Sequence, residues 1–302
     1  MSAIKAGSPA ASRMGTQTLR AKAKPYLFLA PMLLFAAAFI YYPFFKTFLF
    51  SFTTVNFMGE ITGWAGLDNF RYLFSRRDFA TALTNSLKLT AMNVPLTLII
   101  TITLALLATR RRKLSPVYET MFALPMAVSM SAAAMIFKAL LSPATGYLNA
   151  LLGLRMGWLE SKAHALYGIL MLTVWMGIGF DYLLFLSAFR AIPTDLTEAA
   201  IIDGAGFMTS LVRVRLPLVS PTLLYVGCTN MVLAMMTSGP IIILTQGGPA
   251  RSTTTLMYMM YTSGYGSSNY SLSACLSIVT FALTFALTLA AFLLERRGVH
   301  YE

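Results

Sequence analysis

Residues 198–205 read Glu198-Ala199-Ala200-Ile201-Ile202-Asp203-Gly204-Ala205, and Leu216-Pro217 follows after a basic, apolar segment. The stretch is rich in small residues, and Pro193 and Pro217 bound it. A hydrophobic run flanks it on each side, long enough for a membrane-spanning helix, which needs about 20 apolar residues. A loop that only joined two spans would be shorter and less ordered. We therefore expect a folded segment that is presented to a partner outside the bilayer.

The composition is that of a polytopic membrane protein without a large soluble domain. Of 302 residues, 57% are hydrophobic and 11% are charged, whereas soluble domains carry about 25% charged residues. The net charge of +12 gathers beside the apolar runs, which favours positive-inside orientation and anionic lipid over a nucleic-acid partner. Two cysteines in apolar runs and two distant histidines predict no metal site.

We predict an all-α fold with about six transmembrane helices in one membrane domain, residues 26–302, behind a basic cytoplasmic tail, residues 1–25. The predicted spans are 26–50, 83–108, 117–141, 165–189, 219–244 and 271–294, and residues 190–218 form the loop between spans four and five. The first run is too long for a signal peptide, and we expect its helix to break or end near Pro43. Four adjacent cations, Arg110 to Lys113, are costly to translocate, which places this turn, the 190–218 loop and both termini in the cytoplasm.

Local signals predict two short helices in the 190–218 loop. Asp195 and Glu198 have the spacing of a capping box behind Pro193, and Gly204 is placed to end the first helix. Apolar residues then recur at helical spacing until Pro217 stops the second helix. From these residues alone, an amphipathic loop that lies on lipid is an equally good interpretation.

The loop resembles the cytoplasmic coupling loop of ABC importer permeases, in which Glu-Ala-Ala is followed by Asp-Gly-Ala and later by Leu-Pro. The matching residues are Glu198, Ala199, Ala200, Asp203, Gly204, Ala205, Leu216 and Pro217. Segments 66–70, 140–149 and 244–249 are similar to those of the carbohydrate-uptake branch, and 244–249 resembles the first of its two paired permeases. Segments 253–258 and 299–302 look closest to the glycerol-3-phosphate permeases.

The resemblance implies a permease subunit in a bacterial plasma membrane that carries a sugar or a glycerol-3-phosphate-like solute inward. It implies a second homologous permease, a dimer of ATP-binding subunits that hold ATP and magnesium, and an extracytoplasmic solute-binding protein. Glu198 would interact with a basic or hydrogen-bonding edge of the ATPase groove, and Gly204 would allow close backbone approach. The sequence has no P-loop and no catalytic constellation, so we expect neither an enzyme nor a bound cofactor.

Polar residues inside the spans are the candidates for the solute pathway. A carboxylate at the depth of Asp181 usually faces the bundle interior or an aqueous path, so we expect either solute contact or a structural hydrogen bond between helices. The other candidates are Asn93, Tyr182, Tyr225, Thr229 and Asn230, for which interhelical packing is the alternative role. A secondary transporter is the rival function, with Asp181 as its only coupling carboxylate and no clear internal repeat.

Overall fold

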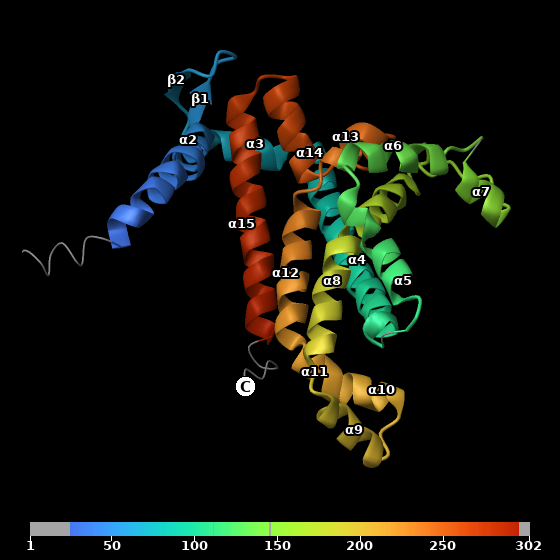
Figure 1. The fold of residues 1–302 in the computed structure, drawn as a ribbon. Helices are drawn as coiled ribbons and strands as arrows, with labels where there is room; N and C mark the ends of the chain where they lie inside the picture. The colour runs from blue at the N-terminus through green and yellow to red at the C-terminus, as the bar shows by residue number, and fades with distance from the viewer. Residues whose placement is uncertain (1–24, 111, 145, 296–302) are drawn as a thin grey trace, which may run out of the picture.

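A computed structural model describes residues 25–110, 112–144 and 146–295 (Figure 1). The predicted tail up to residue 24, Arg111, and the C-terminal segment with Arg296 and Arg297 lie outside the described residues. Within the described residues, four helices are long and apolar enough to cross a membrane, and the number rises to six if two bent helix pairs each count as one span. The structure is an all-α membrane bundle with one small hairpin.

Three of these four helices are α4 (Arg77–Thr109), α8 (Ala165–Ala191) and α15 (Tyr270–Glu295), and the fourth is the first span, described below. The helix α12 (Ser220–Met235) is the longer member of one bent pair. One end of the bundle, here called the hairpin end, carries the strands β1 (Thr53–Val55) and β2 (Ile61–Trp64) with α3 (Asp68–Ser75), α6 (Met130–Leu140), α7 (Tyr147–Leu152), α13 (Gly239–Leu244) and α14 (Leu256–Tyr261). The opposite end, the loop end, carries α9 (Thr194–Ile202), α10 (Phe207–Ser210) and α11 (Leu216–Leu218). The two strands pair antiparallel with Thr53 opposite Trp64.

The first span is a helix from Pro25 to Ser51 that continues past Pro43. Of the two alternatives expected near Pro43, an end of the helix is wrong, whereas its regular α-helical geometry is interrupted there, because a π-turn over Ala37–Tyr41 leads into α2 (Tyr42–Ser51). A proline lacks the amide donor and its ring crowds the carbonyl four residues earlier, and the wider π-turn accommodates both effects. The helix slants away from the bundle in Figure 1. Only its C-terminal part reaches α15, where Phe44 contacts Phe281.

The third and fifth predicted spans are not continuous helices. In place of 117–141, α5 (Ser115–Ala123) runs through a 3₁₀ turn at Leu124–Ala127, which contains Pro125, and α6 follows at a bend of 104°. In place of 219–244, α12 ends at Met235 and α13 begins at Gly239. Pro125 and Pro240 have no amide donor to continue the helix.

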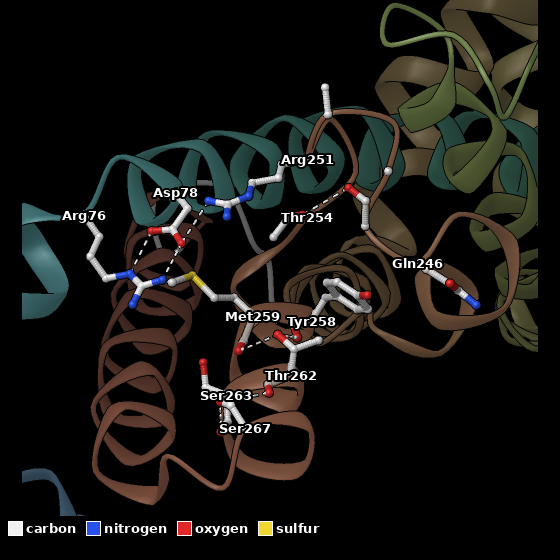
Figure 2. Close-up of a pocket in the computed structure, with 13 residues that line it drawn as sticks. Arg76, Asp78, Gln246, Arg251, Thr254, Tyr258, Met259, Thr262, Ser263 and Ser267 are labelled. Atoms are coloured by element: carbon white, nitrogen blue, oxygen red, sulfur yellow. Dashed lines mark hydrogen bonds and ion pairs between the residues drawn. The ribbon is translucent and has the colours of Figure 1, made fainter.

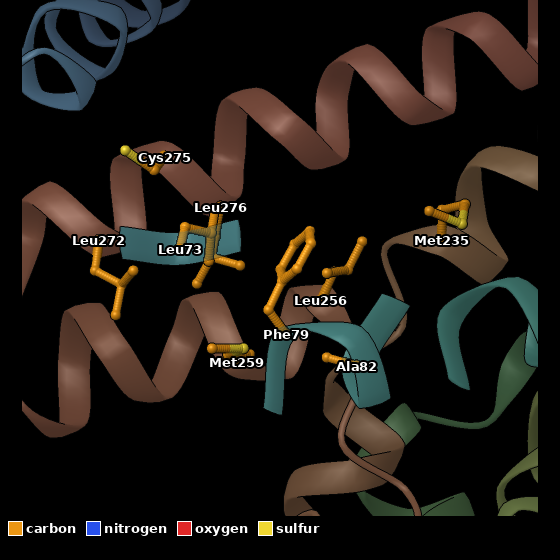
Figure 3. Close-up of a cluster of buried hydrophobic side chains, with 9 residues drawn as sticks. All are labelled: Leu73, Phe79, Ala82, Met235, Leu256, Met259, Leu272, Cys275 and Leu276. Atoms are coloured by element: carbon orange, nitrogen blue, oxygen red, sulfur yellow. The ribbon is translucent and has the colours of Figure 1, made fainter. Parts of the chain in front are cut away.

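Buried clusters at both ends hold the bundle together. Toward the loop end, Tyr182, Phe185 and Phe189 of α8 pack against α4 and α12. At the hairpin end, a cluster joins α3, α4, α12, α14 and α15, and Figure 3 shows its members Leu73, Phe79, Ala82, Met235, Leu256, Met259, Leu272, Cys275 and Leu276. Packing of α4 on α8 and α12 buries the polar stripe Thr90, Asn93, Thr97 and Thr101 inside the bundle.

Candidate functional site

The first helix of the 190–218 loop ends in a Schellman motif at Gly204. Gly204 has a φ of +78°, a left-handed conformation that glycine adopts without strain. The Ala205 amide donates to the Ala200 carbonyl at 2.9 Å, and the Gly204 amide donates to the Ile201 carbonyl at 3.0 Å. These two bonds satisfy carbonyl groups that a helix end leaves without partners. The loop is therefore an ordered element, as expected.

The start of this helix differs from the prediction. α9 begins at Thr194 with Pro193 at its N-cap, and no side chain caps it. Asp195 lies inside the first turn, so the capping box of Asp195 and Glu198 is absent. The chain enters helical geometry two residues early because the proline has a fixed φ and sits where no amide donor is needed.

The second helix runs further than predicted. After α10, a π-turn at Leu211–Arg215 continues into α11, and the chain then bends by 76° into α12. Pro217 occupies an early position of α11, where its missing amide proton is tolerated. The break therefore falls at Val219, two residues after the proline that was expected to stop the helix.

The predicted coupling residues lie mostly on the surface of the loop end. Glu198, Ala199, Asp203, Gly204 and Pro217 are exposed, Ala205 and Leu216 are half-buried, and Ala200 is buried. A side chain at Gly204 or Gly206 would meet nothing within 4 Å.

The loop also presents an apolar tip that the sequence reasoning did not single out. Its members are Ile201, Ile202, Phe207 and Met208, and Ile202 is 84% exposed. Exposed apolar patches beside polar residues are typical of protein–protein contact sites. Their exposure depends on how α9 and α10 fold together, which periodicity does not reveal.

A buried-edge ion pair braces the base of this loop. Arg190, in the last turn of α8, binds both carboxylate oxygens of Glu119 at 2.6 and 3.2 Å and donates to the Ala108 carbonyl at 2.9 Å. It therefore ties α8 to α5 and to the end of α4. Nothing in the sequence pairs Arg190 with Glu119, because the two residues lie 71 positions apart.

A cavity of about 490 Å³ lies among α4, α8, α12 and α13, and its lining includes Asn93, Thr173, Gly177, Asn230 and Thr237. The Asn93 amide donates to the Thr173 hydroxyl at 2.8 Å. The polar part of the cavity wall consists of amide and hydroxyl groups, which both donate and accept hydrogen bonds. The rest of the lining is apolar and includes Met130, Met176, Leu233 and Met236.

Asp181 lies behind this wall. Its carboxylate accepts from the Asn230 amide at 2.6 Å, and the same amide group donates to the Val226 carbonyl at 3.0 Å. The structure thus brings Asp181 and Asn230 together across α8 and α12, as the hydrogen-bond alternative expected, while Asn230 itself lines the cavity.

The other three pathway candidates do not line the cavity. Tyr182 is fully buried, and its ring contacts the edge of Phe122 with centroids 5.4 Å apart. Tyr225 is 56% exposed on α12, and Thr229 is half-buried on the same helix.

A protein-family comparison places this architecture. The family model described as "Binding-protein-dependent transport system inner membrane component" matches residues 93–299, well over half of the chain. The chain belongs to this family. The match begins at Asn93 of the cavity and includes the whole 190–218 loop.

Relatives and solved structures agree with this family assignment. The permease is 32% identical over 282 residues to an sn-glycerol-3-phosphate transport system permease protein of Yersinia pestis biovar Antiqua, strain Antiqua, covering 92% of this chain and 96% of the relative. A counterpart from Salmonella choleraesuis is 31% identical over 287 residues, covering 94% and 97%.

The fold itself recurs in a crystal structure of a bacterial ABC transporter involved in the import of the acidic polysaccharide alginate, with a TM-score of 0.81. That chain is 23% identical, and the match covers 95% of this permease and 99% of that chain. The permease is thus an inner-membrane component of a binding-protein-dependent ABC importer and not an enzyme. The comparisons give no support to a secondary transporter.

Proposed function

We propose that this permease carries a sugar or a glycerol-3-phosphate-like solute inward and that ATP hydrolysis in separate subunits drives the movement. The observation that carries the proposal is the 190–218 loop, an ordered surface element with an apolar tip, Ile201, Ile202, Phe207 and Met208, at the end of the bundle. The relatives named for sn-glycerol-3-phosphate support one solute class. The uncharged amide and hydroxyl groups within the largely apolar cavity support a sugar equally well.

In this proposal the loop end faces the cytoplasm and binds a dimer of ATP-binding subunits, which hold ATP and magnesium. The segment between α4 and α5, with Arg110, Arg112 and Lys113, adjoins Arg190 at this end, and Arg213 and Arg215 belong to the π-turn between α10 and α11. This distribution of cations agrees with the positive-inside rule. A second homologous permease completes the pathway, and a solute-binding protein delivers solute at the hairpin end. Both termini then lie in the cytoplasm.

The loop is built to pass motion to the spans. α9 follows α8 directly, and α11 leads into α12, so displacement of the loop moves both helices. The ion pair of Arg190 with Glu119 joins α5 to this unit. Glu198 would contact the ATPase groove from the exposed face of α9, and Gly204 leaves room for a close backbone approach. Ala199, Asp203, Ala205, Leu216 and Pro217 complete the proposed docking surface.

The solute pathway in this proposal passes the cavity beside Asn93 and Asn230. Asp181 orients Asn230 through their hydrogen bond. Tyr225 and Thr229 lie on α12 outside this cavity, so we assign them to a face that the second permease would cover. Tyr182 would act only through packing, since its ring lies in the apolar cluster with Phe185 and Phe189.

Solute-stimulated ATP hydrolysis tests the docking assignment. The permease would be co-expressed with the subunits of its genomic neighbourhood, and the complex would be reconstituted with the binding protein. We expect Glu198→Ala and Gly204→Asp to lower stimulated hydrolysis toward the unstimulated rate. Glu160→Ala is the matched control, because Glu160 is an exposed carboxylate near Leu244 and Pro249 at the hairpin end. Full coupling in both loop variants would refute the assignment.

A further inference from the structure

A second cavity, of about 520 Å³, opens at the hairpin end (Figure 2). None of its lining residues lines the cavity beside Asn93. The second cavity lies among the start of α4, the 246–255 segment and α14. Its volume is within the about 300–1,000 Å³ typical of small-molecule sites. Three charged side chains line it, Arg76, Asp78 and Arg251, together with the polar groups of Gln246, Thr254 and Thr262.

Two guanidinium groups share one carboxylate in this pocket. Arg76 binds Asp78 through two bonds, from Nε to Oδ1 at 2.9 Å and from Nη2 to Oδ2 at 2.6 Å. Arg251 reaches the same Oδ2 through Nη1 at 3.1 Å. The hydrogen bond to Asp78 raises the pKa of the Arg76 guanidinium above its usual value, so Arg76 stays charged. Two cations against one carboxylate leave a net charge of +1 on the pocket wall.

The two arginines are held differently. Arg76 is largely covered and also donates to the Tyr72 hydroxyl at 3.0 Å. The Arg251 side chain is 64% exposed and makes one ion-pair contact, while Asp78 is only 12% exposed. A guanidinium has five N–H donors, so Arg251 has donors available to a bound anion. Arg76 therefore holds Asp78 in place, and Arg251 is the group that contacts a ligand.

The backbone that carries Arg251 is held in an uncommon conformation. Gln246, Ala250 and Arg251 have φ values of 49°, 49° and 63°, which non-glycine residues rarely adopt. The Asn85 side chain of α4 fastens the segment by donating to the carbonyls of Arg251 and Thr254 at 3.1 and 3.0 Å. Strained backbone persists where the surroundings enforce it, and such places cluster at ligand-binding sites.

We propose that this pocket binds the anionic group, a phosphate or carboxylate, of a small polar solute as it enters from the hairpin end. The inference rests on the proposed function, which places solute delivery at this end. It adds to that function a site that recognises the negative charge of the solute. The cavity beside Asn93 has no cationic side chain in its lining. The cationic pocket supplies the charge recognition which that cavity lacks. The hydroxyl and amide groups of the pocket suit the polar part of the solute.

Equilibrium binding to the purified importer complex, without its binding protein, tests the proposal with sn-glycerol 3-phosphate as the probe. Glycerol is the neutral comparison and inorganic phosphate is the competitor. Arg251→Gln removes the exposed charge and leaves Asp78 paired with Arg76, so we expect the fold to persist and affinity for glycerol 3-phosphate to fall about tenfold, the effect of a charge-assisted contact. Arg251→Lys keeps the charge without the planar fork and is expected to bind with intermediate affinity.

Arg71→Gln is the matched control, because Arg71 is an exposed arginine of the neighbouring α3, paired with an exposed Asp68. We expect it to bind as the wild type does. Equal affinities of the wild type and Arg251→Gln for glycerol 3-phosphate would overturn the inference. Equal affinities of the wild type for glycerol and glycerol 3-phosphate would overturn it too, as would a complex that binds inorganic phosphate but not glycerol 3-phosphate. ATP-driven uptake by the same complex is measured separately, so its absence would count against the proposed function whatever the binding result.

Discussion

Arg190 and Glu119 form a two-point ion pair at the loop end, with N–O distances of 2.6 and 3.2 Å. The pair joins the last turn of α8 to α5, immediately before the chain enters the 190–218 loop. The same guanidinium also donates to the carbonyl of Ala108 on α4. One side chain thus connects the proposed docking element to three helices of the bundle.

Breaking this pair should loosen the loop from the bundle. We expect Arg190→Gln and Glu119→Gln each to destabilise the purified protein and to lower solute-stimulated ATP hydrolysis. The side chains are 25% and 24% exposed, so a double-mutant cycle should give a coupling free energy of about 1 kcal/mol, between a surface and a buried pair. Thermal unfolding in detergent measures the stability, and additive effects of the two changes would show that the pair does not act as a unit.

The left-handed conformation of Gly204 predicts a contrast with its neighbour Gly206. Gly204→Ala should lower the free energy of unfolding by about 1 kcal/mol, because alanine disfavours a φ of +78°. Gly206→Ala should be almost neutral, since the φ of Gly206 is −67° and a side chain there meets nothing within 4 Å. Solute-stimulated ATP hydrolysis, measured in the reconstituted complex, should fall in the Gly204→Ala variant only. Equal activity in both variants would show that the helix end does not need its glycine.

The hydrogen bond between Asp181 and Asn230 predicts unequal effects of its two partners. Asn230→Ala leaves a buried carboxylate without its donor and should destabilise the protein by about 2 kcal/mol. Asp181→Asn should cost less, because the Asn230 amide keeps its bond to the Val226 carbonyl. Thermal unfolding of both variants measures the difference.

Transport assays on Asp181→Asn separate the two roles of this residue. Solute affinity and transport rate equal to those of the wild type would assign Asp181 a structural role, whereas a raised KM would place it in the pathway.

Gly247 should not tolerate a side chain. A Cβ there would lie 2.5 Å from Tyr258 Cε1 and 2.9 Å from Thr254 Oγ1, at a φ of +80°. We expect Gly247→Ala to destabilise the protein by about 3 kcal/mol through overlap and backbone strain together. Gly227→Ala is the control, because Gly227 lies within α12 and a Cβ there would meet only Leu98 Cδ1 of α4, at 4.0 Å. Similar melting temperatures for the two variants would contradict the packing described around Gly247.

Features that depend on local chemistry were predictable. The apolar runs located the first, second, fourth and sixth predicted spans, because burial in lipid requires a continuous stretch of apolar residues. Gly204 marked the end of a helix because its left-handed cap involves only neighbouring residues.

Prolines were a poorer guide to the ends of helices. Pro95 lies inside α4, which remains one helix of 33 residues, whereas breaks occur beside Pro125 and Pro240. A proline removes one hydrogen bond and adds a local clash, and the surrounding packing decides whether the helix bends, widens or stops.

By itself, the sequence determined that this is a helical membrane protein with an ordered loop between its fourth and fifth apolar runs, because hydrophobic length and helix-end chemistry act over a few neighbouring residues. Only the tertiary structure decided which polar groups meet. Glu119 with Arg190, Asp181 with Asn230, and Asp78 with Arg251 are each separated by many residues. Their pairing follows from how the helices pack, and periodicity along the chain carries no record of the partner across the bundle.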